Sequence, residues 1–393
     1  MYRIVSENNE TLGYYDNIYG KLYTNNYEII TSDIDQEEGI VASNDGCKNI
    51  IITLGSNPEY RCTNSKLDSG NFKFDIDRTS NFIDNLEKYV KKHTEIKYID
   101  LYTTTLFNWI TLIDILQSRF KNYVIRIYTN TVRDLTLFQV SHLCFWDNIE
   151  IHTGFMFTEY ESKIINHCPH KFWVTIDISP KGYIPHSIYS DFDVLYNKLK
   201  DVYSSDNQEL EPIIEYIDYT QSLEEDRNIT LRNTIKDFCI NHNGLNKCDM
   251  FGRIANRLFS PKIDIQDCST NHCLLYQVKP LVCTINGDIV RCPNCSCNTK
   301  FMNDLSNNVG VFSEDTQYRK LSENHWVSNR DELKYIDKCL DCEVKAFCNF
   351  CDIDNSEQMD DICCNKTKVI YGGVLDAIIS MQFGDINFKL IEA

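Results

Sequence analysis

The cysteines of this chain constrain its fold more than any other feature. Eighteen are present among 393 residues, and twelve of these fall between Cys268 and Cys364. The first residues, Met1 to Asn8, lack the apolar core of a signal peptide, so we expect a cytoplasmic protein. Structural disulfides are rare in a reducing cytosol. The clustered thiols therefore predict a metal site, with disulfides in an exported protein as the alternative.

Two Cys-x2-Cys pairs and a late Cys-Cys pair form the densest part of this cluster. Its members are Cys339, Cys342, Cys348, Cys351, Cys363 and Cys364. Two intervening residues let both thiolates turn towards one ion or cluster, as in zinc knuckles and ferredoxins. Four thiolates suit zinc and iron–sulfur clusters alike, so the residues alone leave zinc as an alternative.

A hairpin is predicted in the earlier part of the cluster. The segments Val278–Cys283 and Ile289–Cys292 flank Asn286-Gly287. Asn-Gly accepts the positive φ angles of a type I′ turn, which joins two antiparallel strands. Such a hairpin would return Cys292 to the start of the first strand, so that cysteines far apart in sequence could share one metal.

Six further cysteines are scattered over the first two thirds of the chain: Cys47, Cys62, Cys144, Cys168, Cys239 and Cys248. Scattered cysteines usually pack as small hydrophobic residues, and we interpret these six in that way. The sequence His167-Cys168-Pro169-His170 could bind a metal, but no further ligand group lies near it, so we favour a structural role.

Strands and helices alternate through the body of the chain. Short apolar runs typical of buried parallel strands occur at 50–54, 96–102, 123–128, 148–152, 172–178 and 212–217. Apolar residues at helical spacing predict helices at 81–92, 109–120, 159–167 and 191–203. This alternation predicts an α/β fold with a parallel sheet and helices outside it. Residues 218–250 are expected to form a solvated helix that leads to the cysteines.

The net charge of the chain is −18, which argues against binding to nucleic acid or to an anionic membrane surface. No apolar run approaches the roughly 20 residues that span a bilayer. We therefore expect neither nucleic acid nor a membrane as a partner.

The cysteine pattern resembles that of the SPASM domain. The chain contains, in order, Cys273-x13-Gly287-x4-Cys292, then Cys339-x2-Cys342-x5-Cys348, then Cys351 and a late cysteine. SPASM domains follow the radical-SAM core of many peptide-modifying enzymes and bind auxiliary [4Fe–4S] clusters. The usual spacing has three residues between the last two cysteines of the middle group, where this chain has only Asn349 and Phe350. This variant is similar to maturases of grasp-with-SPASM peptide systems, in which the SPASM protein accompanies an ATP-grasp ligase.

The resemblance implies two [4Fe–4S] clusters and their ligands. One cluster would use Cys268, Cys273, Cys292 and Cys351, and the other Cys339, Cys342, Cys348 and Cys363 or Cys364. Three more cysteines, Cys283, Cys295 and Cys297, lie outside the pattern. Cys283 is expected to pack within the hairpin.

The resemblance also implies a radical-SAM core, but its cofactor motifs are degraded. The family carries Cys-x3-Cys-x2-Cys after the first strand, and here Pro58 and Ser65 leave Cys62 as the one cysteine. Proline cannot ligate iron, and serine replaces thiolate poorly. The Gly-Gly-Glu that holds S-adenosylmethionine in the family is replaced within Leu101–Phe107 by a threonine run. We therefore expect no S-adenosylmethionine and no catalytic residues.

Other family landmarks remain. Residues 128–131 resemble the Thr-Asn-Gly that ends the third strand, and 174–177 resemble the strand that carries Ser-x-Asp. The expected fold is a partial (β/α)6 TIM-like barrel of radical-SAM type followed by a small cysteine-rich SPASM iron–sulfur domain. The expected divisions are a β-hairpin-like extension at 1–46, the degenerate barrel at 47–250 and the SPASM-like domain at 251–393.

Three functions compete at this point. The first is a non-catalytic factor in the maturation of a ribosomally synthesised peptide, which binds the precursor peptide and presents it to an ATP-grasp ligase or an active radical-SAM partner. The second is an enzyme that uses its auxiliary clusters. The third is a zinc-stabilised interaction protein of unrelated origin.

Overall fold

Runs of β-branched residues in the body of the chain pair as neighbouring strands of one sheet. The computed structural model describes residues 1–31, 49–55, 75–155, 157–177, 192–204, 211–218, 225–259, 281–290, 308–317, 342–347, 361–384 and 387–392. In this part the main sheet has nine strands in the order β12-β11-β10-β4-β5-β6-β7-β8-β9. Its strands are β4 (Asn49–Thr53), β5 (Tyr98–Tyr102), β6 (Val124–Thr129), β7 (Ile149–Phe155), β8 (Phe172–Asp177), β9 (Ile213–Asp218), β10 (Leu281–Thr284), β11 (Asp288–Val290) and β12 (Asn308–Val311).

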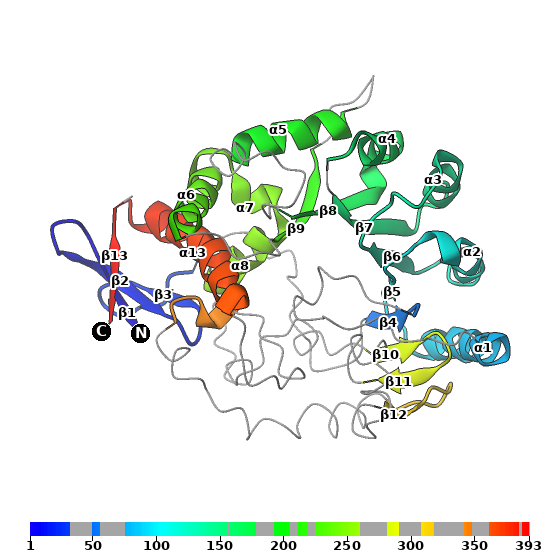
Figure 1. Ribbon diagram of the computed structural model, residues 1–393. Helices are drawn as coiled ribbons and strands as arrows, with labels where there is room; N and C mark the ends of the chain where they lie inside the picture. Colours follow the sequence, from blue (N-terminus) through cyan, green and yellow to red (C-terminus); the bar gives the residue numbers. More distant parts are fainter. Residues whose placement is uncertain are drawn as a thin grey trace.

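Every pairing from β10 through β4 to β9 is parallel, and β4 to β9 follow one another in sequence and in the sheet. Right-handed crossovers that all step in one direction place their helices on one face of the sheet. Figure 1 shows this arrangement, with the helices on the convex side of a curved sheet. These helices are α1 (Ile76–Lys92), α2 (Ile110–Arg119), α3 (Leu137–Cys144), α4 (Glu159–His167) and α5 (Phe192–Tyr203). The chain is thus a mixed α/β protein built on a largely parallel sheet, as the alternation predicted.

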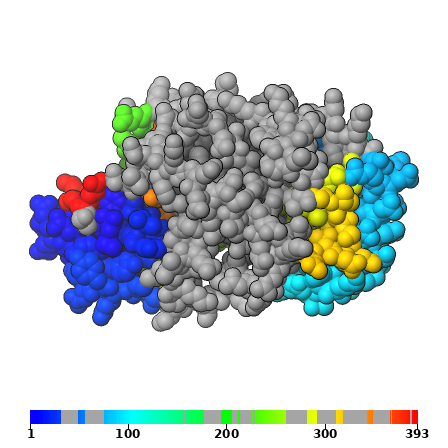
Figure 2. Space-filling model, turned by 90° about the horizontal axis from the view of Figure 1, so that it is seen from below, coloured from blue at the N-terminus to red at the C-terminus, as the bar shows by residue number. Residues whose placement is uncertain are grey.

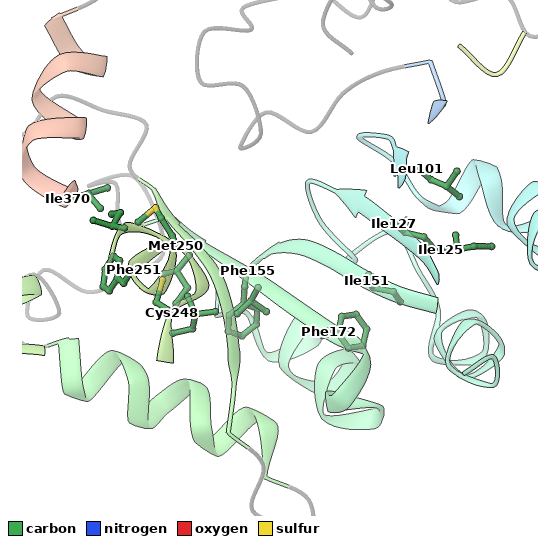
Figure 3. Packing of buried hydrophobic residues seen from close by; sticks show 14 of the residues in the cluster. Leu101, Ile125, Ile127, Ile151, Phe155, Phe172, Cys248, Met250, Phe251 and Ile370 are labelled. Carbon is green, nitrogen blue, oxygen red and sulfur yellow. The ribbon is translucent and has the colours of Figure 1, made fainter. Parts of the chain in front are cut away.

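The main core lies between the sheet and these helices. Alternate strand residues such as Leu101 and Ile127 are fully buried there, together with Leu86 and Ile113 of the helices. Figure 3 follows this layer from Leu101 through Phe155 and Phe172 and on to residues of the next helices. Removal of this apolar surface from water is the main term that holds the helices on the sheet.

The predicted strands and most predicted helices are confirmed, with shifts at their ends. α4 has the bounds expected from the sequence, and its N-cap Thr158 forms a reciprocal capping box with Glu161. α1 begins five residues earlier than expected, because the Asp75 side chain accepts a hydrogen bond from the Arg78 backbone and so starts the helix. The eight-residue helix α3 was not predicted, although Thr136 and Gln139 form a capping box at its start.

Helices α6 (Glu225–Asn241), α7 (Gly244–Lys247), α8 (Asp249–Phe259) and α13 (Asp361–Phe383) form a group beside β9. α6 packs along α13, and α8 contacts α13, β9 and β3. The expectation of a solvated helix in 218–250 was wrong, since Leu231, Ile235 and Phe238 of α6 are buried. The partner that covers them, α13, lies more than a hundred residues later. No helix in the described part of the chain is both long and apolar enough to cross a bilayer.

The two ends of the chain meet in a second, antiparallel sheet. Its order is β13-β1-β2-β3, formed by β1 (Tyr2–Val5), β2 (Thr11–Asp16), β3 (Lys21–Tyr23) and β13 (Lys389–Glu392). β1, β2 and β3 pair antiparallel in sequence order, and the last strand of the chain pairs with β1. Figure 2 shows this sheet at one end of the molecule, with the β12 region beside α1 at the other.

The predicted hairpin around Gly287 is confirmed, but its turn type is not. β10 and β11 pair antiparallel through Cys283 and Ile289. Asn286 does not take the positive φ that a type I′ turn requires, and Gly287 alone does, with φ 86°. The Gly287 amide donates to the Thr284 carbonyl, which makes a longer loop with glycine in the left-handed position. β10 also pairs parallel with β4, so this hairpin extends the main sheet.

Candidate functional site

The face of the main sheet opposite the helices carries a row of neighbouring rings. Tyr102, Tyr128, His152 and Trp173 stand at directly paired positions on β5, β6, β7 and β8. Their ring centroids are 4.9, 4.3 and 5.3 Å apart in that order. Because facing positions of paired strands bring side chains together, the register itself builds this aromatic row.

A second row lies one step towards the amino ends of the same strands. Arg126 pairs in register with Asp100 and Glu150. Its guanidinium donates two hydrogen bonds to Asp100, at 2.7 Å from Nε and 2.8 Å from Nη2. The guanidinium also lies 4.0 Å from the centroid of the Tyr98 ring. A planar guanidinium satisfies a bidentate and a stacking contact at once, which lysine cannot do.

These two rows are mostly shielded from solvent. Tyr128 is 2% exposed and His152 is 4% exposed, whereas Trp173 is partly exposed. The His152 Nε2 lies 3.7 Å from a Glu150 carboxylate oxygen. Trp173 is therefore the member of the aromatic row that a ligand can reach first.

The carboxyl ends of the parallel strands are shaped by threonine and glycine. The Thr129 hydroxyl donates to the Thr104 carbonyl at 3.4 Å and to the Thr131 carbonyl at 3.2 Å. Gly154 on β7 lies so close to the loop after β6 that a Cβ there would be 2.5 Å from the Asn130 carbonyl oxygen. The glycine therefore permits a close backbone approach at this edge of the sheet.

Glu161 of α4 stabilises the same edge of the sheet through its contacts with the loop after β6. Its side chain is fully buried, accepts from Thr131 at 3.3 Å and lies 3.1 Å from Arg133 Nε. The other carboxylate oxygen accepts from the Thr158 hydroxyl at 2.9 Å. A buried carboxylate is tolerated when several donors satisfy it, as here. Glu161 thus joins the loop after β6 to the start of α4.

Cys342 is the one predicted cluster ligand whose side chain the structure describes. It is partly exposed and opens the short turn 342–347. Asn17 donates to the Cys342 carbonyl at 3.0 Å, and the Tyr15 hydroxyl donates to the Glu343 carbonyl at 2.7 Å. Burial and the nearby Glu343 raise the pKa of Tyr15. The N-terminal sheet therefore anchors the turn that carries this predicted ligand.

The remaining predicted ligands lie outside the described residues, except that Cys363 and Cys364 belong to the first turn of α13. Those outside are Cys268, Cys273, Cys292, Cys339, Cys348 and Cys351. The radical-SAM positions Pro58, Cys62 and Ser65 are also outside. Among the described side chains, no group of three or more His, Cys, Asp or Glu could hold a metal ion. Zinc and iron–sulfur ligation therefore both stay predictions.

Five other cysteines have described side chains and test the expected packing as small hydrophobic residues: Cys144, Cys168, Cys239 and Cys248 of the scattered six, and Cys283 of the hairpin. Cys239, Cys248 and Cys283 are buried in the main core, as expected. Burial raises the pKa of Cys248 to about 12. Cys168 is also buried, with the His170 Nε2 3.8 Å from its sulfur, and Cys144 is partly buried against the core.

Sequence reasoning missed the aromatic row and the ionic row, although a signal was present. Strands buried on both faces usually read as continuous apolar runs. In β5 and β6, however, apolar residues such as Ile99 and Ile125 alternate with Asp100 and Arg126. This alternation indicates that one face of the parallel sheet carries polar and charged side chains in place of a purely apolar core.

Comparison with known proteins adds no relative. No family model matches the chain, and no curated protein matches it. The arrangement itself offers the partly exposed ring of Trp173, packed against the buried ring of His152. Such a ring can contact an apolar or aromatic ligand segment through dispersion and cation–π interactions.

Proposed function

We propose that this chain is a SPASM-like iron–sulfur protein on a degenerate radical-SAM-like partial barrel. It acts in the maturation of a ribosomally synthesised peptide without a radical-SAM cluster of its own. The spacing from Cys339 to Cys351, with the earlier and later cysteines around it, is the observation that carries this proposal.

The path of the main sheet supports the barrel part of the proposal. Strands β4 to β9 are parallel, adjacent in sequence order and covered by helices on one face. A partial barrel has this winding, whereas a doubly wound sheet reverses its strand order at a switch point.

The loop after β5 supports the absence of radical chemistry. Three threonines follow the strand where the family has Gly-Gly-Glu, and the Thr103 hydroxyl is engaged with the Thr105 carbonyl at 3.0 Å. A hydroxyl turned back on its own loop does not replace a carboxylate that binds an ammonium group.

The inner face of the sheet supports binding of a peptide. Trp173, at the accessible end of the aromatic row, would contact an apolar side chain of the precursor peptide. The protein would then present the peptide to an ATP-grasp ligase or to an active radical-SAM partner. The acidic chain, with net charge −18, favours a peptide with basic residues.

Metal analysis after anaerobic purification tests the cofactor part. We expect about eight irons and as many sulfides per chain, from two four-iron clusters. Treatment with S-adenosylmethionine and reconstitution should add no further cluster. Zinc without sulfide would contradict the proposal.

Titration with a precursor peptide encoded beside this chain tests the functional part. Trp173 should report binding through its fluorescence, with dissociation constants below tens of micromolar. The variant Trp173→Leu should lose the signal and weaken binding, whereas the exposed Phe138→Leu should leave binding unchanged. A peptide that fails to bind at tens of micromolar would overturn the presentation role.

A further inference from the structure

One face of the antiparallel sheet at the chain ends carries a row of side chains across all four strands. Arg3 of β1 pairs in register with Ile391 of β13 and with Tyr14 of β2, and Tyr14 pairs with Tyr23 of β3. Directly paired positions share one face of a sheet. Arg3 is exposed, Ile391 is 38% exposed, and the two tyrosines are partly exposed. These four residues therefore form an outer row, about 14 Å long at the usual strand spacing.

The other face of this sheet packs on the rest of the molecule. Ile4, Tyr15 and Leu22 occupy the alternate strand positions and are fully buried. α8 contacts β3, and Gly13 lies so close to α13 that a Cβ there would be 2.6 Å from the Phe383 ring. Figure 2 shows the sheet at one end of the molecule. The buried face thus fixes the sheet, and the outer row faces solvent.

A further ring is held beside the outer row. Tyr27, in the turn after β3, is 61% exposed, and its ring lies 4.4 Å from the Tyr14 ring with 18° between their planes. The Tyr27 amide donates to the Thr24 carbonyl at 3.0 Å, and the Asn25 side chain donates to the Thr11 carbonyl at 2.8 Å. Tyr27 has a φ of 60°, a left-handed conformation that costs free energy for any residue with a Cβ. The turn therefore displays this ring at a cost to its backbone.

Arg3 differs from the other arginines whose side chains the structure describes. Each of the others contacts a carboxylate or lies over an aromatic ring: Arg78, Arg119, Arg126, Arg133, Arg232, Arg253 and Arg257. Within the described part of the chain, Arg3 makes no such contact. Carboxylates are plentiful in a chain with net charge −18. An exposed arginine without one is therefore free to bind an anion from another molecule.

We propose that the outer row docks an extended acidic segment of a partner protein, in which an aspartate or glutamate stands beside a proline or an aromatic residue. The Arg3 guanidinium binds the carboxylate through two parallel hydrogen bonds. The Tyr14 and Tyr27 rings contact the flat apolar side chain next to it, as aromatic surfaces do in recognition of proline-rich segments. About four residues of an extended chain match the length of the row.

A short peptide fits this face better than a nucleic acid does. The net charge of −18 opposes a long polyanion along its whole length. For a short acidic segment, charges farther away than about 8 Å are largely screened at physiological ionic strength, so the contact with Arg3 decides. The outer row lies on a different sheet from Trp173 of the proposed peptide site. The inference is therefore independent of the proposed function, and its partner differs from a basic precursor peptide.

Peptide selection on the full-length protein tests this surface. Random dodecapeptides displayed on phage should be enriched in sequences that place Asp or Glu beside proline or an aromatic residue. Fluorescence anisotropy then measures the affinity of synthetic copies of these peptides. Arg3→Gln should weaken their binding by about tenfold or more, because the charged hydrogen bonds are lost. Arg253→Gln should leave binding unchanged, since it removes an exposed arginine that already pairs with Asp249. Enrichment without acidic residues, or equal affinity for wild type and Arg3→Gln, would overturn the proposal.

Tyr27→Gly separates binding from stability. It removes the ring and relieves the positive φ, which glycine adopts freely. Binding of the selected peptides should weaken by about fivefold or more, while the thermal unfolding midpoint stays the same or rises. A lower midpoint with unchanged affinity would show that the ring serves the fold alone, and the proposal would be wrong. An acidic oligosaccharide that binds through Arg3 when no peptide does would also contradict it, because the partner would then not be a protein segment.

Discussion

Arg232 of α6 and Asp376 of α13 face each other in a bidentate ion pair. Arg232 Nε lies 2.6 Å and Nη2 3.0 Å from the two carboxylate oxygens of Asp376. The third guanidinium nitrogen donates to Glu343, which follows Cys342 in its turn. One side chain thus holds together two helices and the turn that carries a predicted cluster ligand. Burial raises the pKa of Asp376, while Arg232 opposes that rise.

Asp376→Asn should destabilise the fold by about 2–4 kcal/mol, because the shielded guanidinium of Arg232 loses its bidentate counter-charge and is left with the single contact to Glu343. Urea unfolding followed by circular dichroism would measure the change. The pair Arg119–Asp84 has the same chemistry but is more exposed, so Asp84→Asn should cost less than about 1 kcal/mol. Equal costs for the two variants would show that burial does not set the strength of the first pair.

Arg126→Lys should destabilise the sheet by about 1–2 kcal/mol, because lysine cannot keep both hydrogen bonds to Asp100 and the stacking on Tyr98. Thermal unfolding would report the loss as a lower midpoint. Arg78→Lys is the matched control, since Arg78 is largely exposed and contacts Asp288 through one nitrogen. If Arg78→Lys lowers the unfolding midpoint as much as Arg126→Lys does, the paired hydrogen bonds and the ring contact of Arg126 are not the source of its contribution to stability.

Tyr203→Phe should change the dependence of stability on alkaline pH. Burial raises the pKa of Tyr203, whose hydroxyl donates to the Phe172 carbonyl at 2.9 Å. An unfolded tyrosine ionises near pH 10.0, so this residue's contribution is complete below that pH and declines as the pH rises above it. The variant should be less stable by about 1 kcal/mol at neutral pH. Its unfolding free energy should fall less steeply above pH 10.0, as denaturation at several pH values would show; parallel curves would contradict this.

Cys342→Ala should lower the iron content of the anaerobically purified protein by about half, since one of two four-iron clusters would lose a ligand. Colorimetric iron and sulfide assays would measure this loss. Cys283→Ala should leave iron unchanged, because Cys283 is fully buried in β10 among core residues. A full iron complement in Cys342→Ala would remove Cys342 from the ligand set.

Local sequence patterns were sufficient for most of the sheet and its helices. The apolar run at Ile50 and the helical spacing around Ile113 reflect preferences that act within one element. The short helix α3 and the long helix α13 were missed for opposite reasons. α3 has only eight residues, which is too short for an apolar stripe to repeat clearly. α13 is apolar on most sides, so its sequence shows no clear alternation of apolar and polar faces at helical spacing.

The candidate site was predicted only in part. The cysteine spacing led to Cys342 and its neighbours, because ligand spacing is a local property of the chain. The aromatic row was not found, because Tyr102, Tyr128, His152 and Trp173 come from four separate strands. Their proximity depends on the register of each strand with the next, and a shift of one residue would move every ring to the other face.

By itself, the amino-acid sequence determined the alternation of strands and helices, the parallel sheet that follows from it, and the concentration of thiols in the last third. The tertiary structure decided which distant segments join. β10 pairs with β4, β13 pairs with β1, and α13 covers α6. Strand edges and apolar helix faces can accept many partners of similar pattern. The choice among them is made by packing of the whole chain, since only one arrangement buries all of these surfaces together.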